Sequence, residues 1–356
     1  MKKIICLIER LGPGGAQRQL VGLSSMLIQQ GYDVELWSWV KQDFFDNVLA
    51  AAGVKNRVIE EARDKKKRIF ILRRELIKAQ PDVLISYLDT PSMVACIAKA
   101  TGGNFKLIVS ERNITTKLSL REKIKFLLYR VADYIVPNSF SQQDFINEHY
   151  PHLSHKVKTI TNFVDTHLFK PCEVKQSSDV AKIIVVARIA QQKNPLFLIE
   201  VIKTLVDRGN KIAVDWYGRP LDKDLYENCL AKIGEYQLGD IFNFLPDTKQ
   251  IAQVYPQYDL FCLPSLHEGY PNVVCEAMSC GLPVVCSAVS DVPRIVENAV
   301  NGYLFSPKSI DSAVESFEKM LSLSQKERTA MGLRNREKMV NEITQEKFVK
   351  EYLKLI

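Results

Sequence analysis

The chain has 356 residues, of which 46% are hydrophobic and 25% charged. This composition is typical of globular proteins, and the length is sufficient for two domains with separate cores. No apolar run reaches the about 18 residues that a membrane-spanning helix needs. The first apolar run stops at Glu9 and Arg10, so no signal peptide is predicted and the cytoplasm is the expected compartment.

The net charge of +7 is unevenly distributed. Residues 1–165 carry 25 Lys and Arg against 17 Asp and Glu, whereas the remainder carries 23 against 24. Residues 62–80 and 117–132 concentrate this excess and mix it with Ile, Leu and Phe at helical spacing. Two readings remain open: solvated surface helices, or a patch that binds anionic lipid head groups or a lipid-linked substrate. Nucleic acid is not an expected partner, because interleaved aromatic residues are lacking.

Short apolar runs alternate with longer helical patterns along the chain. Continuous rather than alternating hydrophobicity is typical of parallel strands covered on both faces. The sequence therefore predicts an α/β fold with two doubly wound Rossmann-like domains that face each other across a cleft. The expected strands are 2–8, 33–39, 82–87, 105–110 and 133–137 in the first half, and 182–187, 211–218, 259–264 and 282–287 in the second.

The pattern restarts near residue 182, after a polar stretch that contains Pro and Ser. We therefore expect an N-terminal domain over 1–165, a linker over 166–181 and a C-terminal domain over 182–339. Residues 340–356 form a predicted C-terminal helix that caps the second domain or crosses back to the first.

Several polar groups follow predicted strands, at the edge where parallel sheets bind ligands. Gly14 and Gly15 follow the first strand and open a helix, so they would let an anion approach the backbone, although a plain tight turn has the same pattern. Glu111 and Arg112 in SERN end strand 105–110 and are acceptor-side candidates; the alternative is a local ion pair. Arg188 and Lys193 follow strand 182–187, and two cations there suit a diphosphate, although a pair of surface charges on the loop is the alternative.

The segment SLHEGYPNVVCEAMSCGLPVV, residues 265–285, is the most informative part of the second half. Glu268 lies in its Gly- and Pro-rich loop, and Glu276 lies eight residues further on, in an apolar run that reads as a helix. Carboxylates accept hydrogen bonds from sugar hydroxyls, and a helix N-terminus offers N–H groups to phosphate oxygens. Surface carboxylates are the alternative.

Metal and disulfide sites are not expected. The eight cysteines include no C-x-x-C pair and several lie in apolar runs, which indicates buried thiols. Asp222 and Asp224 form an Asp-x-Asp, but a capped helix start explains this pair better than a divalent cation does.

Taken in order, GPGGAQRQL, SERN, NFVDTHLF, VVARIAQQKNP and LPSLHEGYPNVVCEAMSCGLPVV with NGYLF resemble the retaining glycosyltransferases of family four, which have the GT-B fold. The resemblance runs nearly end to end and is most specific over residues 183–305. Two departures are the SERN segment, where many relatives carry a histidine, and FLPDT, where a glycine is usual near the base.

The resemblance implies a role for each candidate residue. Arg188 and Lys193 would neutralise the donor diphosphate, Glu268 would hold the donor sugar and Glu276 the ribose. Gly15, with Gly14 beside it, would approach the diphosphate from the first domain. Backbone groups would contact sugar and phosphate at Gly269, Tyr270, Pro271, Asn272 and Val273, and backbone from Phe244 to Asp247 would meet the base.

We therefore expect a metal-independent hexosyltransferase without cofactor that moves a sugar from a nucleotide sugar, UDP favoured over GDP, to a lipid-linked or oligosaccharide acceptor in bacterial surface glycan synthesis. The expected location is the cytoplasm, peripheral to the inner face of the plasma membrane through the basic N-terminal domain. Two alternatives remain: a GT-B-fold sugar-nucleotide epimerase, and a non-catalytic subunit that binds sugar nucleotides.

Overall fold

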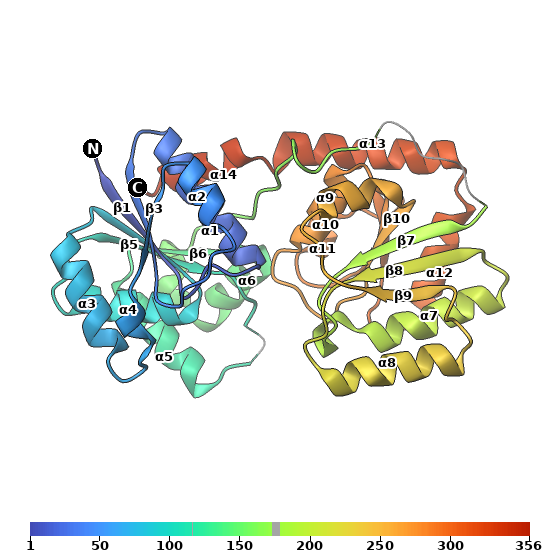
Figure 1. The fold of residues 1–356 in the computed structure, drawn as a ribbon, viewed down its shortest axis with the longest axis horizontal. Coiled ribbons are helices and arrows are strands. Elements are labelled where there is room, and N and C mark those ends of the chain that lie inside the picture. The colour runs from blue at the N-terminus through green and yellow to red at the C-terminus, as the bar shows by residue number, and fades with distance from the viewer. Residues whose placement is uncertain (116, 173–178) are drawn as a thin grey trace. The chain divides into compact units, whose positions relative to one another are not determined.

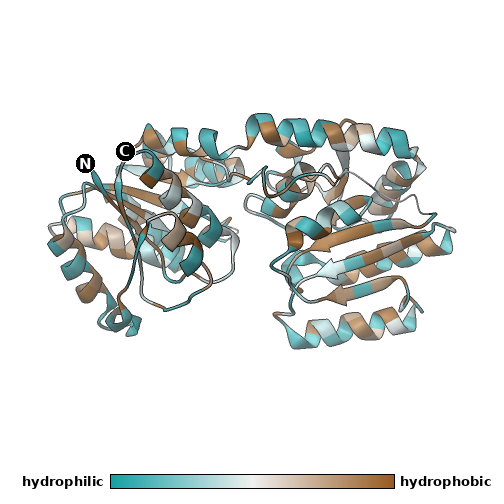
Figure 2. Cartoon of the chain, turned by 45° about the horizontal axis from the view of Figure 1, so that its top comes forward, coloured by the Kyte–Doolittle hydropathy of each residue, from teal (hydrophilic) through white to brown (hydrophobic). Residues whose placement is uncertain are grey.

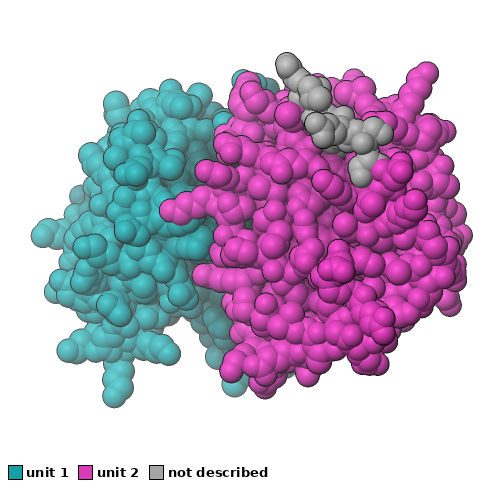
Figure 3. All heavy atoms as spheres, turned by 45° about the vertical axis from the view of Figure 1, so that its right-hand side comes forward, with its two compact units in different colours: residues 1–163, 345–356 teal, residues 164–344 magenta. Residues whose placement is uncertain are grey.

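The computed structural model describes residues 1–115, 117–172 and 179–356 (Figure 1). The chain divides into two compact units: unit 1 comprises Met1–Phe163 and Gln345–Ile356, and unit 2 comprises Val164–Thr344 (Figure 3). Each unit is built on a six-stranded sheet in which all of the paired strands run parallel. In the described part of the chain, no helix combines the length and the hydrophobicity that a membrane span requires.

The sheet of unit 1 has the order β3-β2-β1-β4-β5-β6. Its strands are β1 (Lys3–Leu7), β2 (Asp33–Ser38), β3 (Lys55–Val58), β4 (Val83–Tyr87), β5 (Lys106–Glu111) and β6 (Tyr134–Pro137). The helices are α1 (Gly15–Gln29), α2 (Asp46–Ala51), α3 (Arg68–Ala79), α4 (Asp89–Ala100), α5 (Leu120–Leu128), α6 (Phe140–His149) and α14 (Gln345–Leu353).

Two cores cover the two faces of this sheet, because successive side chains of a strand point to opposite sides. Ile4 and Cys6 of β1 pack with α1, α2 and α14, whereas Ile5 and Leu7 pack with α3, α4 and α5. Continuous hydrophobic strands are the consequence, and Figure 2 shows them in brown.

The sheet of unit 2 has the order β12-β11-β10-β7-β8-β9. Its strands are β7 (Ala181–Val186), β8 (Ile212–Tyr217), β9 (Phe242–Leu245), β10 (Leu260–Leu263), β11 (Val284–Ser287) and β12 (Gly302–Phe305). The helices are α7 (Pro195–Asp207), α8 (Lys223–Glu235), α9 (Ile251–Val254), α10 (Asn272–Ser279), α11 (Val292–Ile295), α12 (Ile310–Ser322) and α13 (Gln325–Glu342). Again two cores flank the sheet: Ile183 packs with α7, α8 and α12, and Ile184 with α9, α10 and α11.

The C-terminal helix α14 belongs to unit 1. Phe348, Val349 and Tyr352 are buried in the core that includes α1, and the Tyr352 hydroxyl lies 2.9 Å from the Tyr87 hydroxyl at the end of β4. The predicted start at residue 340 differs from the structure, because nothing in the sequence stops α13 there and it continues to Glu342.

The predicted linker also differs. Val164 and Phe169 are buried in a core of unit 2, so the chain as far as Phe169 is anchored to that unit. Arg336 of α13 fixes this stretch, since its guanidinium donates to the carbonyl oxygens of Thr166 at 2.9 Å and Phe169 at 2.7 Å. Residues 173–178 of the predicted linker lie outside the described part of the chain.

Candidate active site

The carboxyl ends of β7 and β10 bring the predicted cations and carboxylates of unit 2 together. These strands are neighbours in the sheet, so the loops that follow them lie side by side. Gln192 ties the loops to each other: its carbonyl oxygen accepts from the Leu266 amide at 2.8 Å, and its side-chain amide donates to the His267 carbonyl at 2.8 Å. Segments about 75 residues apart in sequence therefore form one continuous wall.

Lys193 and Glu268 form an ion pair across these two loops. Lys193 Nζ lies 2.5 Å from Glu268 Oε1, and the two side chains are 12% and 9% exposed. Ser290, from the loop after β11, accepts from the Glu268 amide at 3.1 Å. The ion pair holds a cation and a carboxylate in fixed positions at the carboxyl edge of the sheet. A ligand that separates the pair can bind an anionic group to Lys193 and a hydroxyl group to Glu268.

Arg188 lies two residues after the end of β7 and is exposed. Gly218, at the end of β8, fixes the backbone beside it. A Cβ atom at Gly218 would lie 2.0 Å from the Ala187 carbonyl oxygen, so only glycine allows the two strand ends to approach so closely. Trp216 adds a hydrogen bond of 2.7 Å from Nε1 to the same oxygen. The guanidinium therefore projects from a rigid backbone.

The segment Gly269–Val273 leads into α10, whose first residue is Asn272. No side chain caps this helix, and the backbone N–H of Val273 has no hydrogen-bond partner among the described residues. Such free N–H groups at a helix start favour an anion or a hydroxyl oxygen. Tyr270 and Pro271 are buried, so the backbone and not these side chains is available to bind a ligand.

Glu276 is the fifth residue of α10 and is 6% exposed. The hydroxyl of Tyr255 donates to Glu276 Oε2 at 3.3 Å, and it lies 3.5 Å from the Val273 carbonyl oxygen. Tyr255 is fully buried. Nothing in the local sequence, VYPQYD, distinguishes this tyrosine from a core aromatic residue, so its place in the site is not predictable from sequence.

Glu111 is not presented to solvent, and the local ion pair is the reading that the structure supports. This side chain is 1% exposed and lies 2.8 Å from Lys125 Nζ of α5. Gln142 of α6 donates to the same oxygen, Oε2, at 3.3 Å, and Tyr129 donates to the other oxygen, Oε1. Burial raises the pKa of Glu111, whereas the charge of Lys125 opposes that shift.

Arg112 is also buried and points into unit 1. Its guanidinium lies 4.4 Å from the centroid of the Tyr87 ring and donates to Asn162 Oδ1 at 2.5 Å. Direct contact of Glu111 or Arg112 with an acceptor therefore has no support in this arrangement. Arg112 instead links the end of β5 to Asn162, and Glu111 links it to α5 and α6.

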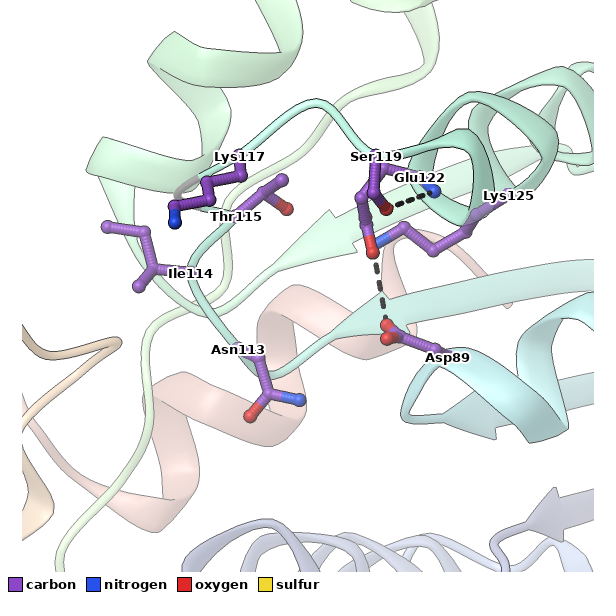
Figure 4. Close-up of a pocket in the computed structure, with 8 residues that line it drawn as sticks. All are labelled: Asp89, Asn113, Ile114, Thr115, Lys117, Ser119, Glu122 and Lys125. Atoms are coloured by element: carbon purple, nitrogen blue, oxygen red, sulfur yellow. Dashed lines mark hydrogen bonds and ion pairs between the residues drawn. The ribbon is translucent and has the colours of Figure 1, made fainter. Parts of the chain in front are cut away.

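A polar hollow of about 200 Å³ lies beyond Glu111, at the carboxyl ends of β4 and β5 (Figure 4). The residues that line it come from the start of α4, the loop after β5 and α5: Asp89, Asn113, Ile114, Thr115, Lys117, Ser119, Glu122 and Lys125. Lys125 Nζ lies 3.3 Å from Asp89 Oδ1, so the buried cation orients this carboxylate.

Gly14 and Gly15 lie at the start of α1, on the same edge of the unit 1 sheet. Both are exposed, Gly14 has the extended φ of 177°, and no side chain caps the helix. The open helix start fits the predicted approach of an anion, while no backbone strain requires glycine at position 14. Among the described residues, no group of three or more His, Cys, Asp or Glu side chains is placed to hold a metal ion.

Comparison with known proteins identifies the family of the chain. Residues 13–168 match the model "Glycosyltransferase Family 4", and residues 172–338 match "Glycosyl transferases group 1". An uncharacterised glycosyltransferase of Haemophilus influenzae is 27% identical over 90% of this chain and 91% of its own length. A Campylobacter jejuni N-acetylgalactosaminyltransferase, whose name gives an undecaprenol-diphosphate-linked acceptor, is 27% identical over 78% of this chain and 77% of its own.

Solved structures show the same fold. Anabaena HepE, crystallised with UDP and glucose, has a TM-score of 0.86 and 18% identity, with 99% of each chain covered. TarM has a TM-score of 0.83 and 14% identity over 100% of this chain and 98% of its own.

Two α/β units, each with a parallel six-stranded sheet, define the GT-B fold of these structures. Since the two models together match nearly the whole chain, it belongs to glycosyltransferase family 4. The fold class and the family resemblance inferred from the sequence are thereby confirmed.

Proposed function

We propose that this glycosyltransferase is a retaining, metal-independent hexosyltransferase that uses a nucleotide sugar, with UDP favoured over GDP as the nucleotide. The observation that carries the proposal is the meeting of Lys193 with Glu268 between the loops after β7 and β10, with Arg188 on one loop and Glu276 on the helix that follows the other. Crystals of HepE contain UDP-glucose, which supports UDP as the favoured nucleotide.

In the proposed reaction the bond between the sugar C1 and the diphosphate oxygen breaks, and its electron pair goes to the diphosphate. The acceptor hydroxyl forms the new bond to C1 on the same face, and its proton passes to a diphosphate oxygen. Arg188 and Lys193 stabilise the charge that grows on the leaving group, so no metal is needed for that purpose. Glu268 holds sugar hydroxyls and Glu276 the ribose.

The proposed acceptor is a glycan linked to polyprenyl diphosphate, in the synthesis of a bacterial surface polysaccharide. Support comes from the Campylobacter relative and from an Escherichia coli galactosyltransferase, 28% identical over 45% of this chain, which is named for a diphosphoundecaprenol acceptor. We place the enzyme at the inner face of the plasma membrane, because such an acceptor is anchored there and unit 1 carries the basic segments.

The test is an assay with UDP-, GDP- and ADP-sugars, in the presence and absence of EDTA, that follows release of the nucleoside diphosphate and the anomeric configuration of the product. We expect UDP release, unchanged by EDTA, and a product with the anomeric configuration of the donor. Conversion of the donor to its epimer without transfer would refute the proposal in favour of an isomerase, and binding without turnover would favour a non-catalytic subunit.

Arg188→Ala and Glu276→Ala test the site assignment. Loss of one group that stabilises transition-state charge lowers the rate by about 10²–10³-fold, and we expect this for Arg188→Ala. Glu276→Ala should chiefly raise the donor KM. The matched control is Arg208→Ala, because Arg208 is a surface cation of the same unit paired with Glu318 at 3.1 Å. Full activity in both site variants would show that the assignment is wrong.

A further inference from the structure

The helix α5 carries exposed aliphatic side chains that its own fold does not use. Leu120 is 75% exposed, Ile124 44% and Leu127 59%. The spacing i, i+4, i+7 places the three side chains on one stripe of the helix. Lys125 and Phe126, in contrast, are buried and anchor α5 to unit 1. Removal of the exposed stripe would therefore leave the core unchanged.

Basic side chains flank this stripe. Lys117 and Lys123 are exposed and form no ion pair among the described residues, while Arg121 keeps only a 3.8 Å contact with Asp89. Leu118, 44% exposed, extends the apolar stripe into the turn before the helix. An aliphatic stripe bordered by cations is the pattern of a helix that lies in a lipid–water interface.

The second basic segment lies on the same side of unit 1. Leu72 of α3 and Phe126 of α5 belong to the same core, and α4 packs against both helices. On the exposed part of α3, Phe70 is 76% and Ile69 37% exposed, directly after Lys65–Arg68. Figure 1 shows α3, α4 and α5 along one side of the sheet of unit 1.

We propose that this side of unit 1 docks on an anionic lipid bilayer, with the α5 stripe inserted among the lipid head groups. The docking surface, here called the α3–α5 surface, comprises the exposed apolar residues Ile69, Phe70, Leu118, Leu120, Ile124 and Leu127 and the cations Lys65, Lys66, Lys67, Lys117, Arg121 and Lys123. Each cation near an anionic bilayer adds about 1 kcal/mol of attraction, which corresponds to roughly a fivefold gain in affinity.

The positive charge of the α3–α5 surface favours an anionic bilayer over a second copy of the chain as the group that covers it. Two α3–α5 surfaces brought together would place twelve cations close to one another, so self-association through this surface is unfavourable. Anionic lipid offers the opposite charge together with an apolar layer for the leucines. An anionic bilayer is therefore complementary both to the cations and to the apolar side chains of the α3–α5 surface.

The α3–α5 surface borders the polar hollow of Figure 4, because Lys117 and Ser119 at the start of α5 line that hollow. A lipid-borne acceptor would thus have its anchor in the bilayer beside α5 and its sugar end within reach of Asp89 and Asn113. This last step rests on the proposed acceptor class, whereas the lipid docking itself does not.

The test is flotation of the purified full chain with vesicles of phosphatidylcholine alone or with a third phosphatidylglycerol. We expect binding to the anionic vesicles only, weakened by salt. The variant L120N/I124N/L127N should lower the partition coefficient by about tenfold or more. K65Q/K66Q/K67Q removes three cations at roughly fivefold each, so it should lower the coefficient by about 100-fold. Unchanged circular dichroism would show that both variants fold.

The matched control is L221N/L230N/L333N, which removes three leucines of unit 2 that are 53%, 45% and 62% exposed; it should float like the wild type. The proposal is overturned if the wild type does not float with anionic vesicles, or if L120N/I124N/L127N and the control have the same partition coefficient. Donor turnover with a water-soluble acceptor is measured separately, and L120N/I124N/L127N should keep this turnover. If the wild type shows no turnover, the proposed function is refuted, whereas the proposal of lipid docking is not affected.

Discussion

The buried Lys125 offers the sharpest test of how unit 1 is held together. Its Nζ lies 2.8 Å from Glu111, 3.3 Å from Asp89 and 2.7 Å from Glu122, and its side chain is 3% exposed. Lys125→Met keeps the length of the side chain but leaves Glu111, 1% exposed, without its cation. Removing one partner of a buried ion pair costs about 3–5 kcal/mol, and we expect a loss of stability in this range.

A double-mutant cycle with Glu111→Gln separates the charge from the packing. Lys125→Met/Glu111→Gln removes both charges, so it should recover at least about 1.5 kcal/mol relative to Lys125→Met. Lys123→Met on the exposed face of α5 is the control and should change stability by less than about 0.5 kcal/mol.

Hydrogen exchange is the suitable measurement, because two units need not unfold together. Amides of β5 and α5 should lose protection in Lys125→Met, while amides of β7 in unit 2 report an unaffected reference. A cost below about 1 kcal/mol in β5, or a double variant no more stable than the sum of the single changes, would refute the buried-pair reasoning.

Three further predictions concern single features of the structure. Tyr255→Phe removes the hydroxyl that orients Glu276, so the donor KM should rise about three- to tenfold and discrimination between UDP and 2′-deoxy-UDP should fall, as measured by calorimetry. Gly218→Ala places a Cβ 2.0 Å from the Ala187 carbonyl and should destabilise unit 2 by more than about 2 kcal/mol in urea. Burial lowers the pKa of Lys125, but the nearby carboxylates outweigh this effect and raise the pKa above its ordinary value. The contribution of Lys125 to stability is therefore present below about pH 10.4 and is lost as the pH rises further. Unfolding measured as a function of pH should show this loss in the wild type but not in Lys125→Met/Glu111→Gln.

Continuous hydrophobicity predicted the inner strands of both sheets, and each of the nine expected strands is present. The three strands that were missed, β3, β9 and β12, all lie at an edge of a sheet. An edge strand has one neighbour and is partly solvated, so its sequence need not be apolar throughout. Lys55–Val58 of β3, mostly exposed, shows this directly.

Sequence alone predicted those residues of the candidate site that directly follow the end of a strand. Arg188 and Lys193 follow β7 and Glu268 follows β10, and the adjacency of these strands brings them together. Glu111 follows a strand end in the same way, yet its carboxylate is held by other residues of unit 1. The partners Lys125 and Gln142 come from α5 and α6, 14 and 31 residues further on, and no local pattern in the sequence predicts them.

Arg112 shows that a family pattern can reflect stability as well as chemistry. Its guanidinium binds Asn162, and Gln19 of α1 pairs with both backbone groups of Phe163, at 2.8 Å to the carbonyl and 3.0 Å from the amide. GPGGAQRQL, SERN and NFVDTHLF are therefore joined within unit 1, at the point where the chain passes into unit 2. Because the Gln19 amide and the Arg112 guanidinium both have partners within unit 1, these side chains fix the end of unit 1.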